Sequence, residues 1–313
     1  MVAVTVIGDV NVDVITSPIE KYPEEDSQIV LSLAQLVPGG CACNTAIGCA
    51  NFGVKTRLIG KIGGDAFSDY LLKILKNFDV DCKIKTEKEK NTGLTFAVNF
   101  KNMTRSMFTY RGTNEFLSTN DFNSRDIEGN ILVVTGFNHL NALRKDIKVL
   151  FKYAKSKGMK TFLDPNWDPE GWTENRLNDI YEILKYTDYF FPSSEEGQAI
   201  TKANDERLAV KKLMYLGAKT VCLKMDEKGC LLGLENTIKH IDGFAVNSVN
   251  TTGAGDIFLA GFIKGYLSDW PIENTVRFAN AAGAISTTKI GLGKYPGLKD
   301  VKDFLKSRGV EVD

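Results

Sequence analysis

The chain has 313 residues, 43% of them hydrophobic and 25% charged, which is enough to bury the core of one large domain. Its 39 basic and 39 acidic residues balance, so the composition argues against a surface for nucleic acid or for an anionic membrane. Six cysteines without a Cys-x-x-Cys pair, together with only two histidines, argue against a disulfide scaffold and against a structural metal site.

The first predicted element is a β-branched strand at residues 3–8. No basic segment precedes this run and it meets a carboxylate at Asp9, so we expect a strand and not a signal peptide. No apolar run approaches the roughly 20 residues that span a bilayer, and we therefore expect a cytoplasmic protein. Asn11 and Asp13 follow the strand, where open α/β sheets place their ligands, and both can hydrogen-bond to sugar hydroxyls. A solvated turn is the alternative.

Three separated runs then depart from the order of strands and helices. They are residues 28–33, 94–100 and 106–110. In each run apolar side chains recur with period two, which is typical of β-strands. We expect a small sheet, formed by insertions at about 15–37 and 82–116 into a single domain of residues 1–313, with its apolar face covering a ligand or the main domain. Plain surface hairpins are the alternative.

A glycine-rich turn, Pro38-Gly39-Gly40, lies between the first two of these runs and begins a helix predicted at about residues 41–52. Gly39 and Gly40 would let a substrate approach the backbone closely, because neither carries a Cβ. Asn44, one turn into the helix, can reach the same substrate hydroxyls.

From residue 131 onward short apolar runs alternate with helical segments, which predicts right-handed βαβ units. We therefore expect an α/β fold with a doubly wound, mostly parallel sheet flanked by helices. Two polar segments follow strands of this series. Ser193 and Glu196 begin a helix, for which a cap is the plain interpretation, and Lys224 to Gly229 form a loop at the same sheet edge.

The most informative stretch is Asn250 to Gly261, which changes from polar and glycine-rich to apolar at Ile257. A turn should lead there into a buried helix, whose free N–H groups form an anion site that Gly253 and Gly255 leave open. Asp256 would weaken anion binding, unless it takes a proton from a hydroxyl that attacks a phosphoryl group. A glycine-rich turn before a core helix is the alternative. The chain contains neither a Gly-x-Gly-x-x-Gly pattern at this place nor a phosphate loop with Gly-Lys-Ser/Thr.

Asn250 to Gly261 and Gly39 to Ala46 resemble the C-terminal and N-terminal signatures of the ribokinase/PfkB carbohydrate kinase family. The resemblance implies a ribokinase-like fold in which the small sheet is a lid over the sugar site and often supplies a homodimer contact. It also implies an ATP-dependent phosphotransferase that acts on a hydroxyl of a sugar or sugar-like small molecule. Mg²⁺ is the implied cofactor, and a monovalent cation is left open because Asn250 replaces the family's aspartate.

The resemblance also assigns roles to single residues. Asp256 is the implied base, and the N–H groups of Gly253, Ala254 and Gly255 hold the developing negative charge. The implied substrate-binding residues are Asn11, Asp13, Gly39, Gly40 and Asn44. The implied nucleotide-binding residues are Lys224, Gly229, Thr252, Asn280 and Gly291. Glu196 is implied to order the water around Mg²⁺.

The substrate class is indicated by Leu163 to Asn166, which resembles the branch of the family that phosphorylates ketohexoses and 2-keto-3-deoxy sugar acids. That branch usually has arginine where Asp168 stands, so this chain lacks a cation that would bind the carboxylate of an acidic substrate. Nucleosides and inositol are the alternative substrates within the family. A sugar sensor without turnover is an alternative of another class, suggested by departures at Ser193, Asp226 and Asn250.

Overall fold

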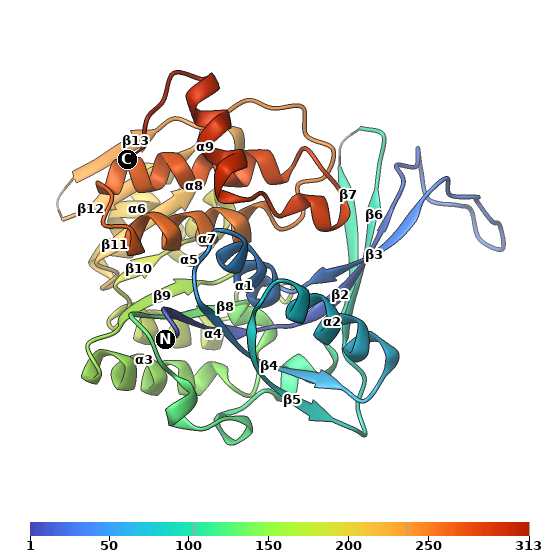
Figure 1. The fold of residues 1–313 in the computed structure, drawn as a ribbon, viewed down its shortest axis with the longest axis horizontal. Helices are drawn as coiled ribbons and strands as arrows, with labels where there is room; N and C mark the ends of the chain where they lie inside the picture. Colours follow the sequence, from blue (N-terminus) through green and yellow to red (C-terminus); the bar gives the residue numbers. More distant parts are fainter. Residues whose placement is uncertain (103, 236, 313) are drawn as a thin grey trace.

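The computed structural model, which describes residues 1–102, 104–235 and 237–312, is built on two β-sheets (Figure 1). The large sheet has nine strands in the order β13-β12-β11-β10-β9-β8-β1-β4-β5. Its strands are β1 (Val4–Gly8), β4 (Thr56–Gly63), β5 (Asp81–Glu87), β8 (Ile131–Thr135), β9 (Lys160–Asp164), β10 (Tyr189–Phe190), β11 (Thr220–Lys224), β12 (Cys230–Leu234) and β13 (Thr237–Ile241). All neighbours from β5 to β11 pair in parallel, and only β12 and β13 are antiparallel. The predicted doubly wound, mostly parallel sheet is therefore confirmed.

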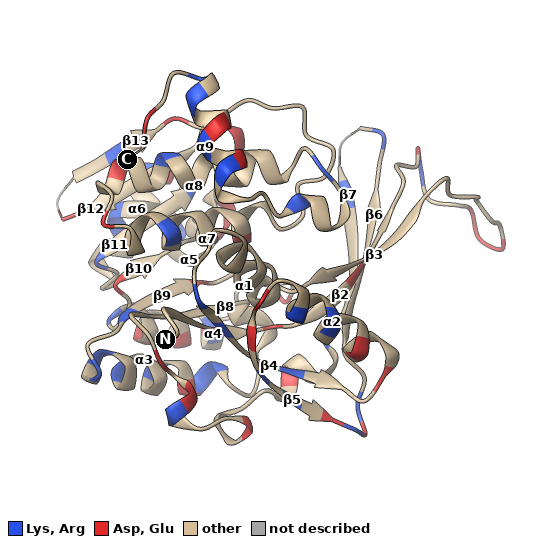
Figure 2. Ribbon diagram, in the orientation of Figure 1, with Lys and Arg blue, Asp and Glu red and all other residues tan. Residues whose placement is uncertain are grey.

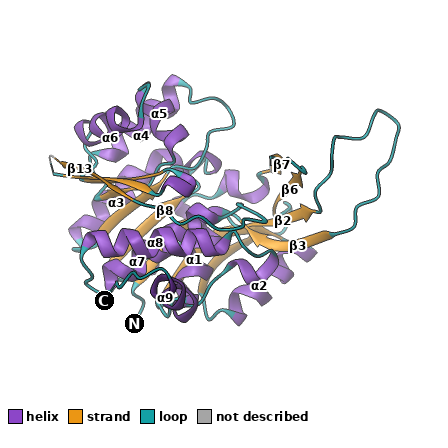
Figure 3. Cartoon of the chain, turned by 90° about the horizontal axis from the view of Figure 1, so that it is seen from above, coloured by secondary structure: helices purple, strands orange, loops and turns teal. Residues whose placement is uncertain are grey.

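Helices cover both faces of the large sheet, as Figure 3 shows. One face packs against α1 (Cys41–Asn51), α2 (Ala66–Asn77), α7 (Ala254–Leu267), α8 (Ile272–Ser286) and α9 (Leu298–Ser307). The other packs against α3 (Ile147–Ser156), α4 (Glu174–Leu184), α5 (Ser194–Thr201) and α6 (Glu206–Tyr215). Strands buried on both faces need continuous apolar runs, and β1 and β8 are buried at every position.

The small sheet has the order β3-β2-β6-β7 and stands beside the large sheet (Figure 1). Its strands are β2 (Asn11–Thr16), β3 (Ala34–Gly39), β6 (Gly93–Asn99) and β7 (Arg105–Tyr110). Asn11 and Asp13 thus lie in a strand and not in a turn. The second expected insertion, at about 82–116, also takes in β5, which pairs with β4 in the large sheet.

The strand predicted at residues 28–33 is wrong, because the strand paired with β2 begins at Ala34. Ser17 N still donates to Leu33 O, but Pro18 has no N–H with which to continue the ladder. Residues 17–33 instead form a projecting arm, whose tip is acidic in Figure 2.

The expected orientation of the small sheet is also wrong. Thr95 and Ala97 of β6 are buried, whereas Phe96 between them and Phe108 of β7 are 45% and 56% exposed. The apolar face therefore points away from the body of the protein. Toward the body, β6 presents the small and polar side chains of Thr95 and Ala97, and Ile15 of β2 and Val37 of β3 are buried on the same face. The polar part of this face suits a wall around a polar ligand.

Among the helices of the described residues, none is long and apolar enough to cross a membrane. Figure 2 shows basic and acidic residues interspersed over the outer helices.

Candidate active site

The turn into α7 is the centre of the candidate site. Gly253 precedes the helix with a φ of 85°, a left-handed conformation that glycine adopts without strain. The N–H groups of Gly253, Ala254 and Gly255 therefore lie at the positive end of the helix dipole, which favours an anion. Ala254 N makes only a long hydrogen bond of 3.3 Å to Thr251 O, so it can exchange this partner for a phosphoryl oxygen.

Asp256 lies in the first turn of α7 and is buried, with 8% of its surface exposed. Asn44 Nδ2 donates to Asp256 Oδ2 at 2.8 Å. Burial, and after it the carboxylate of Asp164, raises the pKa of Asp256 to about 8, while Asn44 and Lys224 oppose this rise. A carboxylate whose pKa lies near neutral pH is suited to take a proton from a hydroxyl.

Two charged residues at the carboxyl ends of strands lie next to this turn. Asp164 ends β9 and Lys224 ends β11, and Lys224 Nζ donates to Asp164 Oδ2 at 2.6 Å. A Cβ added at Gly255 would lie 3.3 Å from Lys224 Nζ, so the ammonium lies against the start of α7. Burial opposes the charge on Lys224, but Asp164 and Glu196 raise its pKa to about 12. Lys224 therefore keeps its positive charge beside the candidate anion site.

The expected substrate residues come together where β2 meets the turn between β3 and α1. Asn11 pairs with Gly39 across the small sheet, and a Cβ at Gly39 would lie 2.0 Å from Asp13 Oδ1. Gly40 has a φ of 86°, which begins α1 and brings Asn44 toward the base. Burial raises the pKa of Asp13 to about 6. These side chains offer both donors and acceptors to a polyol.

Glu196 has a structural role that the sequence also allowed. Ser193 N donates to Glu196 Oε2 at 2.8 Å and Glu196 N donates to Ser193 Oγ at 3.2 Å, so the pair caps α5. Burial raises the pKa of Glu196 to about 7, against the attraction of Lys224, and the nearby Asp164 adds to the rise. Asp164, Glu196 and Asp256 thus share Lys224 as a nearby cation, and a further cation at this place would favour the charged forms of Glu196 and Asp256.

This donor set fits Mg²⁺, a hard cation that prefers carboxylate oxygens and keeps several waters. In the described part of the chain, no three His, Cys, Asp or Glu side chains are grouped to hold a metal directly. Glu196 and Asp164 would therefore hold such an ion largely through its bound water.

The expected nucleotide residues lie in separate places. Gly229 and Asn280 meet at residues 241–243: Asn280 Nδ2 donates to Ile241 O at 3.2 Å and to Asp242 O at 3.0 Å, and a Cβ at Gly229 would lie 2.1 Å from Ile241 O. Gly291 does not join them. A Cβ there would lie 2.5 Å from the side chain of Gln35, next to the small sheet.

Sequence reasoning missed two residues that reach this site. Arg105 of β7 donates from Nη1 to Thr251 Oγ1 at 2.5 Å and to Thr252 Oγ1 at 3.3 Å, which joins the small sheet to the loop before α7. Tyr295 donates from its hydroxyl to Asn44 Oδ1 at 2.7 Å. Neither residue lies in a motif, and no local pattern in the sequence indicates these contacts.

The chain is similar to carbohydrate kinases both in sequence and in fold. A family model described as pfkB family carbohydrate kinase matches residues 1–296. Ribokinase of Haemophilus influenzae is 28% identical over 96% of this chain and 98% of its own length. Fructokinase-2 of Oryza sativa subsp. japonica is 30% identical over 81% of this chain and 80% of its own length. A solved E. coli structure, provisionally named ribokinase II and in complex with ATP and Mg²⁺, shares the fold with a TM-score of 0.87 at 21% identity, over 98% of this chain and all of the other.

Proposed function

The chain belongs to the pfkB family of carbohydrate kinases, and we propose that it transfers the γ-phosphoryl group of ATP to a hydroxyl of a ketohexose. The observation that carries the proposal is the contact between Asp256, at the start of α7, and Asn44 of the substrate-side helix α1. This contact joins a base, an anion site and a polyol site in one place.

The residues assign the steps of the transfer. Asp256 accepts the proton of the acceptor hydroxyl as its oxygen forms a bond to the γ-phosphorus, and the bond to the bridging oxygen breaks to leave ADP. The N–H groups of Gly253, Ala254 and Gly255 hold the negative charge that develops on the phosphoryl oxygens. Lys224 stabilises the same charge from β11. When bound, Mg²⁺ would neutralise part of the phosphate charge, and Glu196 and Asp164 would hold its water.

A neutral acceptor is preferred to a sugar acid because the guanidinium groups near residues 168–176 are already paired. Arg176 lies 3.3 Å from Asp168 and 2.7 Å from Glu170, and Arg111 lies 2.7 Å from Glu170. A substrate carboxylate would have to displace one of these partners. The similarity to fructokinase-2 also supports a ketohexose, because fructose is a neutral sugar of that class.

We also propose that the small sheet is a lid that closes over the sugar and excludes water from the transfer. The hydrogen bonds from Arg105 to Thr251 and Thr252 support this role, because they join the sheet to the anion site. The outer face of the sheet, with Phe96 and Phe108 exposed, supports a homodimer, because a second copy would cover this apolar surface.

A monovalent cation is not required in this proposal. Asn250 Oδ1 accepts from Thr252 N at 3.0 Å, and its Nδ2 is buried without a hydrogen-bond partner among the described residues. The amide of Asn250 is neutral, so this position lacks the negative charge with which a carboxylate would attract a cation.

The test is a substrate panel. Purified protein with ATP and Mg²⁺ should release ADP with a ketohexose, and faster than with keto-sugar acids, nucleosides or inositol. If ADP were released only with a sugar acid, the proposal of a neutral acceptor would be rejected. No release above the acceptor-free rate with any compound would favour a sugar sensor, although a sensor gains nothing from a base at Asp256.

A further inference from the structure

Tyr295 ends a chain of two hydrogen bonds that leads to the candidate base. Its hydroxyl donates to Asn44 Oδ1 at 2.7 Å, and Asn44 Nδ2 donates to Asp256 Oδ2 at 2.8 Å. Both side chains before the base are buried, with Tyr295 4% and Asn44 3% exposed. Water therefore does not compete freely for these bonds.

The direction of the chain follows from its chemistry. A carboxylate that acts as a base can only accept, so the amide nitrogen of Asn44 must face Asp256. The amide oxygen of Asn44 then needs a donor, and Tyr295 supplies one. Because hydrogen bonds in series polarise one another, the bond from Tyr295 also strengthens the bond from Asn44 to the base.

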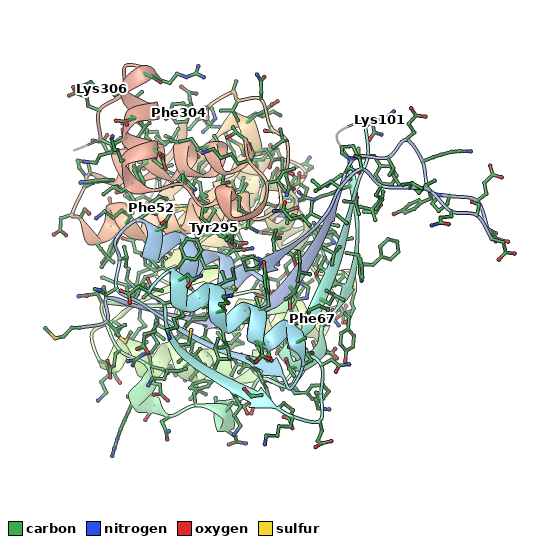
Figure 4. The ribbon with its side chains drawn as sticks, turned by 45° about the vertical axis from the view of Figure 1, so that its right-hand side comes forward. Phe52, Phe67, Lys101, Tyr295, Phe304 and Lys306 are labelled. Carbon is green, nitrogen blue, oxygen red and sulfur yellow. The ribbon has the colours of Figure 1, made fainter. Side chains whose placement is uncertain are left out.

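The ring of Tyr295 is held independently of its hydroxyl. It packs edge-on against Phe78 with centroids 5.6 Å apart, and its backbone oxygen accepts from Asn51 Nδ2 at 2.8 Å. The neighbouring Lys294, also buried, donates to Pro38 O at 3.2 Å. Figure 4 shows Tyr295 where the C-terminal segment meets α1 and α2. Replacement by phenylalanine should therefore remove the hydroxyl and leave the ring in place.

We infer that Tyr295 is a positioning residue for the phosphoryl transfer, which acts on Asp256 by fixing the amide plane of Asn44. This inference rests on the proposed role of Asp256 as the base. Without the hydroxyl, the amide of Asn44 loses one of the two hydrogen bonds that fix its plane and keeps only the bond to Asp256. The donor that orients the carboxylate toward the acceptor hydroxyl is then held less firmly. Small displacements of a reacting group reduce rate far more than they reduce binding.

A double-mutant cycle distinguishes this role from packing. The variants are Tyr295→Phe, Asn44→Ala and both together, with Tyr181→Phe as the matched control. Tyr181 also loses a hydroxyl hydrogen bond, of 2.7 Å to Ile200 O, but lies in α4 on the other face of the sheet.

Tyr295→Phe should lower kcat by about 10-fold and change KM for ATP less than about 2-fold. With Asn44→Ala already present it should lower kcat no further, because its route to Asp256 is gone. The control should retain the wild-type kcat.

An unchanged kcat in Tyr295→Phe, or an equal fall of kcat in the Asn44→Ala background, would overturn the inference. A crystal structure of Tyr295→Phe tests it without any substrate. We expect the Asn44 amide to turn and its 2.8 Å contact with Asp256 to lengthen. If both side chains keep their places, the inference is wrong whether or not an acceptor is known. A wild-type protein without turnover on the panel would instead count against the proposed function.

Discussion

Replacement of Asp256 by asparagine should reduce turnover and, at the same time, stabilise the protein more at high pH than at low pH. Loss of a general base lowers kcat by about 10²- to 10⁴-fold. The stability effect arises because the pKa of Asp256 rises from its ordinary 3.8 to about 8 in the folded protein. Between these values the folded state binds more protons than the unfolded state, so the wild-type free energy of unfolding falls as pH rises.

The size of the effect follows from the same pKa. The asparagine variant lacks this titration. The difference in free energy of unfolding between the variant and the wild type should therefore grow from pH 6 to about pH 8 and stay constant from there to pH 9. At about 1.4 kcal/mol for each pH unit, the growth is at most about 3 kcal/mol. With an unfolding entropy of about 2.1 cal/mol/K per residue, this corresponds to a difference in Tm of roughly 4 °C for a chain of 313 residues.

The assay pairs a coupled measurement of ADP release with thermal melts at pH 6 and pH 9, recorded without ATP or Mg²⁺. Asp79→Asn, at a carboxylate whose side chain is 88% exposed, controls for the substitution itself. Near-normal turnover of Asp256→Asn would refute its role as the base. A gap in Tm that is equal at the two pH values would refute the raised pKa.

Three further predictions concern the substrate, the cation and the assembly. Asp13→Ala should weaken acceptor binding by about 1.5 to 3 kcal/mol, through loss of a charged hydrogen bond to a hydroxyl, with little change in KM for ATP; an equal loss for both substrates would misplace the two subsites. Turnover should be the same with K⁺ as with tetramethylammonium, because the neutral Asn250 stands where the family has a negatively charged aspartate; strong activation by K⁺ would contradict this. Sedimentation equilibrium should give twice 34.6 kDa, and Phe108→Glu, which places a charge on the outer face of the small sheet, should return the mass to 34.6 kDa. A wild-type monomer at micromolar concentration would exclude the dimer.

The sequence by itself determined the parts of the protein whose chemistry is local. Strands such as β8 and β11 belong to the short apolar runs that the sequence shows from residue 131 onward, because a strand buried on both faces must be continuously apolar. The turn at Gly253 could also be predicted, since glycines before an apolar helix leave its N–H groups open. Asp256 could also be identified from the sequence, because a carboxylate in an anion site needs a chemical explanation.

Only the tertiary structure decided which distant segments meet. Alternation in β6 predicts two faces but does not say which of them is buried, and the small and polar face proved to be the inner one. Tyr295 lies 251 positions after Asn44, which in turn lies 212 positions before Asp256. Neither the secondary-structure propensity nor the hydrophobic period of any one segment predicts such a contact, because the contact depends on how α1, α7 and the C-terminal segment pack against one another.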